Sequence, residues 1–161
     1  MTFFYAVPRS LLTETDVLRT CDADARRAHA FGVEAEMSPE NLKSGFEGRF
    51  SAMTLEACHA GHRGPATFTM KVSSDNGGVY IRRLFDQRAG RQAARISVDG
   101  RVVGTWYTVE GNAVLRWAER DYFLPRSVTA GKDSLQIRIE PVSDAPPWDA
   151  SEYRALSVEQ R

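Results

Sequence analysis

The feature that most constrains this fold is a series of short apolar runs, separated by turn residues, across Gly78–Ile139. Within it, Asp99-Gly100 separates two segments, residues 92–98 and 101–107. Two turn residues of this type between apolar segments are typical of a tight β-hairpin. Just upstream, Thr67–Val72 alternates strictly between apolar and polar residues. Because side chains on a strand point to opposite faces in turn, the pattern predicts antiparallel strands.

About eight to ten strands with turns at short intervals predict an all-β fold, specifically a two-sheet antiparallel jelly-roll β-sandwich with at most one or two short helices. The acidic-then-basic segment from Asp22 to His29 is compatible with a short helix capped by Asp22, and an irregular loop is the alternative. Alternation also places Arg82 and Arg83 on opposite sides of a strand. We expect one of them to face the core, with Asp86 as its partner.

A chain of 161 residues is long enough for one domain with its own core. The periodic pattern predicts a sandwich domain over residues 1–145 and a C-terminal tail over 146–161, whose polar part from Ser151 onward is expected to be surface-bound or loose. Phe3–Val7 is expected as a strand at a sheet edge. Ser38–Asn41 is expected as a turn, and the Gly-containing segment His59–Pro65 as a loop.

Charge and composition bear on the possible partners. Lys plus Arg and Asp plus Glu each number 21, so the net charge is zero, whereas nucleic-acid binding usually shows a basic excess. No apolar run approaches the length of a membrane span. We expect neither a nucleic-acid nor a membrane partner and, without a glycine-rich phosphate loop, no cofactor. Two cysteines, Cys21 and Cys58, are expected as free thiols of a cytoplasmic protein.

One group of residues resembles metal ligands. Cys58, His59 and His62 lie within five positions of one another, and thiolates and imidazoles both bind zinc. A structural zinc site takes four ligands, usually from two paired clusters. The remaining candidates, Cys21 and His29, match no familiar spacing. The sequence therefore predicts a polar loop here and no metal site.

Paired carboxylates are candidates for catalysis. Glu119 and Asp121 are two positions apart, so on a strand they share a face at about 7 Å, near the separation of the two working carboxyl groups of glycosidases. Glu47 with Glu56, and Glu34 with Glu36, are weaker candidates of the same kind. Such pairs are also common as ordinary surface charge, which is the alternative interpretation.

Aromatic residues concentrate in the C-terminal two-thirds of the chain. Exposed rings can stack on sugars while a neighbouring guanidinium binds hydroxyl groups. The ligand-binding candidates on this basis are Trp106, Tyr107, Arg116, Trp117 and Trp148. Core packing is the alternative, and it is favoured for Trp106 and Trp117 because large rings dominate sandwich interiors. Trp148, in a proline-rich segment, is expected at a surface or an interface.

Residues 78–86, 98–107 and 116–125 resemble the C-terminal part of glycoside hydrolase family 172, and Asp133–Ile139 resembles its closing strand. That family includes α-arabinofuranosidases and enzymes acting on fructose disaccharide anhydrides. The resemblance implies a jelly roll and assembly into trimers. The family's catalytic glutamates lie in sequence without a match here, so no catalytic residue is carried over. The matched motif residues resemble scaffold positions: Arg83, Asp86, Trp106, Trp117 and Asp121.

Three functions are compatible with these observations. The first is a non-catalytic module that binds carbohydrate, self-assembles as a homo-oligomer, or both. The second is a small glycosidase whose active site forms between subunits. The third is a structural assembly protein built on a jelly roll, since this fold serves many roles.

Overall fold

The computed structural model describes residues 11–47 and 53–160. Within these residues it contains twelve strands and two short helices, so the predicted all-β class is confirmed. The strand predicted at Phe3–Val7 lies outside the described residues. The strands are β1 (Leu12–Arg19), β2 (Gly32–Val33), β3 (Met37–Gly45), β4 (Thr54–His62), β5 (Ala66–Lys71), β6 (Asn76–Asp86), β7 (Ala93–Val98), β8 (Arg101–Tyr107), β9 (Trp117–Pro125), β10 (Ser134–Pro141), β11 (Trp148–Ala150) and β12 (Glu152–Glu159). The helices are α1 (Ala23–Ala28) and α2 (Arg126–Thr129).

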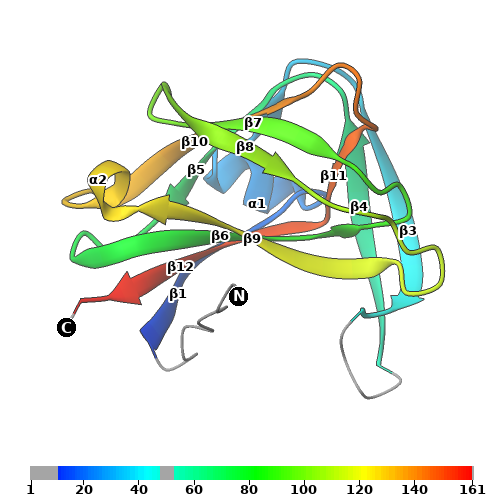
Figure 1. Cartoon of the computed structure of the whole chain (residues 1–161), viewed down its shortest axis with the longest axis horizontal. Helices are drawn as coiled ribbons and strands as arrows, with labels where there is room; N and C mark the ends of the chain where they lie inside the picture. The colour runs from blue at the N-terminus through cyan, green and yellow to red at the C-terminus, as the bar shows by residue number, and fades with distance from the viewer. Residues whose placement is uncertain (1–10, 48–52, 161) are drawn as a thin grey trace, which may run out of the picture.

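Two antiparallel sheets pack face to face, in the strand orders β1-β12-β6-β9 and β2-β5-β10-β7-β8 (Figure 1). Alternate side chains from both sheets fill the space between them. Phe68, Ile81, Ile96 and Ile137 are fully buried there. Removing such side chains from water is the main force that holds the two sheets together. The predicted β-sandwich is therefore the observed architecture.

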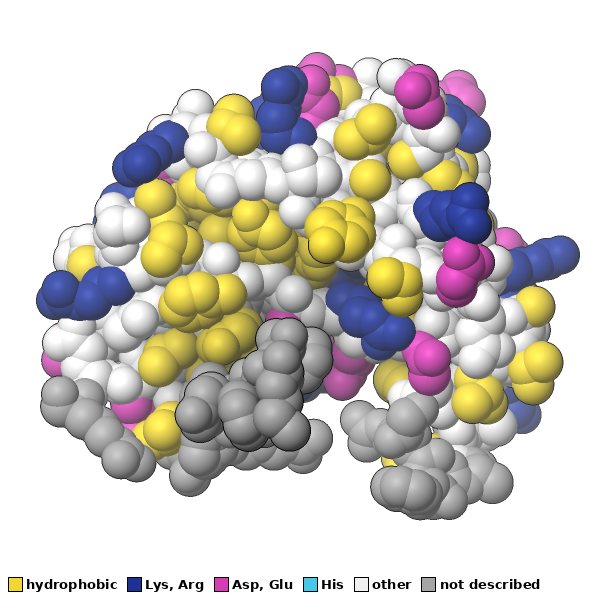
Figure 2. All heavy atoms as spheres, viewed as in Figure 1, with side chains coloured by type: hydrophobic (Ala, Val, Ile, Leu, Met, Phe, Trp, Pro, Cys, Tyr) yellow, Lys and Arg dark blue, Asp and Glu magenta, His cyan; other side chains and the backbone are white. Residues whose placement is uncertain are grey.

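The hairpin predicted from Asp99-Gly100 is confirmed between β7 and β8. Both residues have positive φ angles, 49° and 81°, as the tight hairpin turn requires. β8 and β9 are the edge strands of the two sheets on the face shown in Figure 2, where hydrophobic side chains gather over them. Trp106 and Tyr122 pack across this edge with ring centroids 5.7 Å apart.

The C-terminal tail predicted at residues 146–161 is wrong. Its residues form β11 and β12, and β12 lies inside a sheet, hydrogen-bonded to β1 on one side and β6 on the other. Tyr153 and Ala155 point into the core, while Glu152 and Arg154 alternate with them on the outer face. The sandwich therefore continues through β12 rather than ending at residue 145.

A third sheet, ordered β11-β4-β3, runs across the ends of the other two at the right of Figure 1. The turn predicted at Ser38–Asn41 is wrong, because these residues pair with β4 inside β3. Pro39 fits there because β3 is an edge strand. The loop predicted at His59–Pro65 is also wrong over its first part, since β4 extends to His62.

Of the two alternatives after Asp22, the short helix is the one observed, as α1. The Asp22 carboxylate accepts hydrogen bonds from the backbone N–H groups of Asp24 and Ala25, at 2.8 and 2.9 Å, and these bonds lower the pKa of Asp22. The cap satisfies N–H groups that have no partner inside the helix. Within the described residues, no helix combines the length and apolar character needed to cross a membrane.

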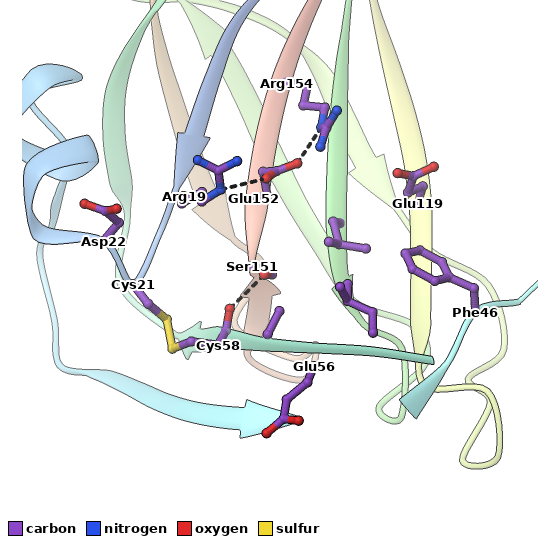
Figure 3. A pocket seen from close by; sticks show the side chains of 13 residues that line it. Arg19, Cys21, Asp22, Phe46, Glu56, Cys58, Glu119, Ser151, Glu152 and Arg154 are labelled. Carbon is purple, nitrogen blue, oxygen red and sulfur yellow. Dashed lines mark hydrogen bonds and ion pairs between the residues drawn. A yellow bond between two sulfur atoms is a disulfide. The ribbon is translucent and has the colours of Figure 1, made fainter. Parts of the chain in front are cut away.

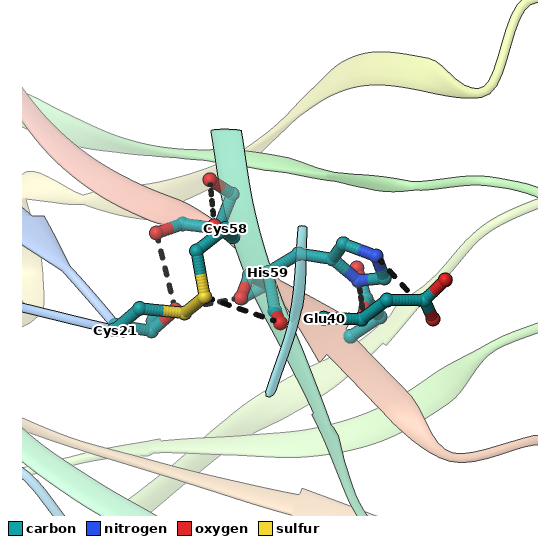
Figure 4. Close-up of a disulfide and its surroundings, with 8 residues drawn as sticks. Cys21, Glu40, Cys58 and His59 are labelled. Atoms are coloured by element: carbon teal, nitrogen blue, oxygen red, sulfur yellow. Dashed lines mark hydrogen bonds and ion pairs between the residues drawn. A yellow bond between two sulfur atoms is a disulfide. The ribbon is translucent and has the colours of Figure 1, made fainter. Parts of the chain in front are cut away.

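Cys21 and Cys58 form a disulfide, so the prediction of free thiols is wrong (Figure 4). Cys21 follows β1 and Cys58 lies within β4; their Cα atoms are 6.1 Å apart, an ordinary distance for a disulfide. The bond therefore ties the third sheet to the corner between β1 and α1.

Arg83 is the arginine that faces the core, as predicted, but Asp86 is not its partner. Its Nη1 donates to the Gln92 Oε1 atom and to the Asp149 carbonyl, both at 2.9 Å. Its guanidinium carbon lies 3.8 Å from the centroid of the Phe85 ring. Burial lowers the pKa of Arg83 to about 9. Asp86 instead pairs with Arg116.

Candidate ligand-binding cavity

An open cavity of about 710 Å³ lies between the outer face of the β1-β12-β6-β9 sheet and strand β4 (Figure 3). Strand register builds one of its walls. Arg19 pairs with Glu152, Glu152 with Leu84, and Leu84 with Glu119. These four residues therefore form one row across all four strands, on the side that faces away from the core. The other lining residues are Cys21, Asp22, Phe46, Leu55, Glu56, Ala57, Cys58, Ser151 and Arg154.

The floor of the cavity is apolar. Leu84 packs in a small cluster with Trp117, and Phe46, Leu55 and Ala57 pack against this cluster. Trp117 is fully buried and donates its Nε1–H to the Leu55 carbonyl at 2.9 Å. This bond joins β9 to β4, so the indole holds the floor in place from beneath.

The rim is polar, and three of its charged side chains form ion pairs with one another. The Glu152 side chain is only 9% exposed, and its carboxylate pairs with Arg154 and, at 3.4 Å, with Arg19. Arg154 also binds Glu14 at 2.9 Å. Next to Glu152, the Ser151 hydroxyl donates to the Cys58 carbonyl on β4 at 2.7 Å, beside the disulfide (Figure 3). Donors and acceptors are thus fixed around an apolar floor, which is the usual composition of a small-molecule site.

Glu119, Asp121 and Glu47, the main catalytic candidates, do not line one cavity, although Glu119 and Asp121 are two positions apart on β9 as predicted. Glu119 lines the cavity. Asp121 forms a bidentate pair with Arg82, with both distances 2.8 Å. Glu47 binds Arg120 at 2.8 Å, and this hydrogen bond lowers the pKa of Glu47. Neither Asp121 nor Glu47 is among the residues that line the cavity.

The predicted indole candidates are all buried, so they present no ring face to a ligand. Trp106 and Trp117 are 3% and 0% exposed, which confirms their predicted core position. The surface position predicted for Trp148 is wrong, since it is fully buried and donates Nε1–H to the Tyr153 hydroxyl at 2.8 Å. In the core, the Trp148 ring packs against the Trp106 ring and the Arg83 guanidinium. These contacts keep Trp148 buried even though prolines precede it in the sequence.

The other two ligand-binding candidates lie away from the cavity. Tyr107 is 69% exposed at the end of β8. Arg116 is held by the Asp86 carboxylate. The sequence interpretation missed Arg19, Glu152 and Arg154. The signal was present in the alternation of charged and apolar residues from Glu152 onward, in the segment interpreted as a tail.

The candidate metal ligands have other partners. The Cys58 sulfur belongs to the disulfide. His59 Nδ1 lies 2.6 Å from the Asp149 Oδ2 atom, and His62 Nδ1 lies 2.8 Å from the Gly64 carbonyl oxygen. Across residues 11–47 and 53–160, no group of three or more His, Cys, Asp or Glu side chains is placed to hold a metal ion.

No family model and no curated protein matches this sequence. Solved structures do match the fold. A carbohydrate-binding module from Cellvibrio mixtus lichenase 5A, in complex with cellotriose, is 13% identical with a TM-score of 0.56, over 92% of this chain and 100% of that one. A family 35 carbohydrate-binding module from Clostridium thermocellum is 14% identical with a TM-score of 0.58, over 89% and 98%.

A third match is part of a larger enzyme. It is a family GH115 4-O-methyl-α-glucuronidase with specificity for decorated arabinogalactans, 15% identical with a TM-score of 0.51, and the match covers 91% of this chain but 18% of that one. At these identities the likeness shows the fold alone. The chain therefore has the jelly-roll β-sandwich fold of these modules.

Proposed function

We propose that this chain is a non-catalytic carbohydrate-binding module whose ligand occupies the cavity beside Glu152. The observation that carries the proposal is the apolar floor at Leu84 and Phe46, bordered by the Glu152 carboxylate and the two guanidinium groups that pair with it. A sugar ring has an apolar face formed by C–H groups and an edge of hydroxyls that both donate and accept hydrogen bonds. The similarity to two carbohydrate-binding modules of almost the same length supports this interpretation.

The charge of the cavity favours a neutral saccharide. Four acidic residues line it, Asp22, Glu56, Glu119 and Glu152, against two arginines, so the formal charge of the lining is −2. A uronic acid or sulfated sugar would meet net repulsion there, because like charges placed together at an interface cost binding energy. Neutral oligosaccharides are therefore the expected ligand class.

The second candidate function is a glycosidase, and one observation favours it: Glu119 and Glu152 stand on either side of Leu84 in the same cavity. Glycosidases need two working carboxyl groups across the scissile bond. Because two arginines hold Glu152, we favour binding over catalysis. Hydrolysis of aryl arabinofuranosides or fructofuranosides that is lost in Glu119→Gln would instead establish the enzyme.

A glycan microarray followed by calorimetry tests the proposed function. We expect the purified chain to bind neutral oligosaccharides, and Arg154→Ala to weaken that binding at least about tenfold, or about 1.4 kcal/mol. Arg95→Ala is the matched control. Arg95 is also a partly exposed arginine paired with a glutamate, Glu140 at 2.8 Å, but it lies in the other sheet. A folded protein that binds no glycan, or equal losses in both variants, contradicts the proposal.

Two expectations from the resemblance to family 172 stay predictions, namely membership of that family and a homotrimer. Exposed apolar side chains at Val102, Tyr107 and Phe123 support self-assembly. Light scattering on the purified chain measures the oligomeric state. A large particle in place of a trimer would favour the structural assembly protein.

Free thiols led us to expect a cytoplasmic protein. The disulfide supports a different location. Disulfides persist in oxidising compartments and are rare in the cytosol of most organisms. We therefore place maturation of this chain in an oxidising environment. Mass spectrometry after alkylation of freshly purified protein, with and without prior reduction, tests this assignment.

A further inference from the structure

Two adjoining hollows of about 560 and 390 Å³ open over one face of the β11-β4-β3 sheet. They share Glu40, Gly61, Pro147 and Asp149. The register places Glu40 opposite His59, and places Gly61 between Ser38 on one side and Asp149 on the other. We call this surface the His59 groove. None of its lining residues lines the cavity beside Glu152.

The side chain of His59 is buried, and only one of its two ring nitrogens is hydrogen-bonded within the described residues. The residue is 5% exposed and its Nδ1 is bound to Asp149. Within the part of the chain that the structure describes, its Nε2 has no hydrogen-bond partner. The Glu40 carboxylate lies 4.0 Å from this Nε2 atom, beyond hydrogen-bond distance (Figure 4). A buried polar atom without a partner is unfavourable, so a polar ligand that reaches it gains binding energy.

The partner of His59 is itself fixed, which makes the imidazole a rigid element of the groove. The Asp149 Oδ1 atom accepts the backbone N–H of Asp86 at 2.7 Å. The backbone N–H of Asp149 donates to Gln92 Oε1 at 3.0 Å. Asp149 is thus held at both its backbone and its side chain, and a preorganised site spends less energy on ordering when a ligand binds.

Glu40 is the movable element. Its side chain is 63% exposed, so it can turn away from His59 without breaking the core. A hydroxyl oxygen about 2.8 Å from both the Glu40 carboxylate and the His59 Nε2 atom would bridge the 4.0 Å between them. A hydroxyl group can donate to the carboxylate and exchange a hydrogen bond with the imidazole at the same time.

Gly61 lies at the floor of the groove and has no side chain to cover it. A Cβ atom built there would lie 3.7 Å from Pro147 Cβ and 3.9 Å from Asp149 Oδ2, both ordinary contacts. The fold therefore has room for a side chain at this position. A glycine inside a strand often marks a place where a ligand approaches the backbone closely.

We infer that the His59 groove is a second ligand site, which takes a neutral saccharide through vicinal hydroxyl groups bound at His59 and Glu40. The groove offers donors and acceptors next to each other. Its other polar lining residues are Glu36, Ser38, His62 and Arg63 in one hollow and Asp86, Arg88, Gln92 and Arg116 in the other. That mixture suits hydroxyl groups, which are both donors and acceptors, better than it suits an ion of either sign. The inference does not depend on the cavity beside Glu152.

Amide chemical-shift mapping of the full chain with cellotriose and xylotriose tests the inference. We expect saturable shifts at Glu40, His59 and Gly61 with at least one of the two sugars. Gly61→Ala should weaken this binding at least about tenfold by filling the floor. Gly32→Ala is the control, since no atom lies within 4 Å of a Cβ built at Gly32.

His59→Gln provides the second variant. It should weaken binding in the groove while leaving shifts around Glu152 unchanged, and Arg154→Ala should do the reverse. This contrast separates failure of one site from failure of the other. No saturable shift in the groove with either sugar, or groove binding that Gly61→Ala leaves intact, overturns the inference.

Discussion

The guanidinium carbon of Arg83 lies 3.4 Å from the centroid of the Trp148 ring, in the interior of the sandwich. Arg83 belongs to β6 and Trp148 to β11, so the contact joins the β1-β12-β6-β9 sheet to the third sheet. A cation over the face of a buried indole gains roughly 2 kcal/mol or more. The pair is thus part of what holds β4 and β11 in position, and both candidate sites lie against that third sheet.

Trp148→Ala should destabilise the protein by about 3–5 kcal/mol, the usual cost of deleting a large buried ring. Trp148→Phe should cost clearly less, because it keeps an aromatic face for Arg83 and loses mainly the hydrogen bond to Tyr153. Urea unfolding monitored by fluorescence and circular dichroism measures both. Equal losses of unfolding free energy in the two variants would show that the aromatic face of residue 148 contributes nothing to stability.

Reduction of the Cys21–Cys58 disulfide should lower the free energy of unfolding by about 2–4 kcal/mol, because the bond closes a loop across a sequence separation of 37 residues. A Cys21→Ser, Cys58→Ser double variant should show the same loss without reductant and no further loss with it. Because Cys58 lines the cavity beside Glu152, saccharide affinity there should also fall. Identical unfolding midpoints with and without reductant would contradict a stabilising Cys21–Cys58 disulfide.

His59 should make stability depend on pH. Burial lowers the pKa of His59, but the hydrogen bond and charge of Asp149, with Asp86 and Glu40 beyond it, outweigh burial and raise the pKa above its ordinary 6.5. A raised pKa in the folded state means that protonation favours folding. This contribution is fully present below pH 6.5, the value in the unfolded chain, and is lost as the pH rises through the folded pKa.

His59→Gln isolates that contribution. The difference in unfolding free energy between the native protein and this variant should be larger at about pH 6 than at about pH 9. Taking the difference is necessary because burial lowers the pKa of His62, which acts in the opposite direction. A difference that is constant with pH, or that grows on the alkaline side, would contradict the assignment.

Local patterns were enough to predict the sandwich. Phe68 and its neighbours alternate strictly, and Asp99-Gly100 can hardly form anything except a tight turn, so both were predictable from a few adjacent residues. β12 was missed because its polar residues, Glu152 and Arg154, are neutralised by partners on another strand, Arg19 and Glu14. That compensation is not visible in the segment itself.

The sites were harder to predict because they also depend on contacts between strands that are far apart in the sequence. The cavity row joins Arg19, Leu84, Glu119 and Glu152, which meet only through the register of four strands. The disulfide likewise depends on two segments that the fold brings to a Cα distance of 6.1 Å. The indoles, the most visible signal for sugar binding, contribute to the core instead.

The most direct test is a crystal structure of the chain grown with the neutral oligosaccharide that binds best in solution. We predict electron density for a sugar ring over Leu84, with hydroxyl groups within hydrogen-bond distance of Glu152 or Arg154. A ligand that binds in solution but leaves this cavity empty in the crystal, while occupying some other surface, would contradict the central claim.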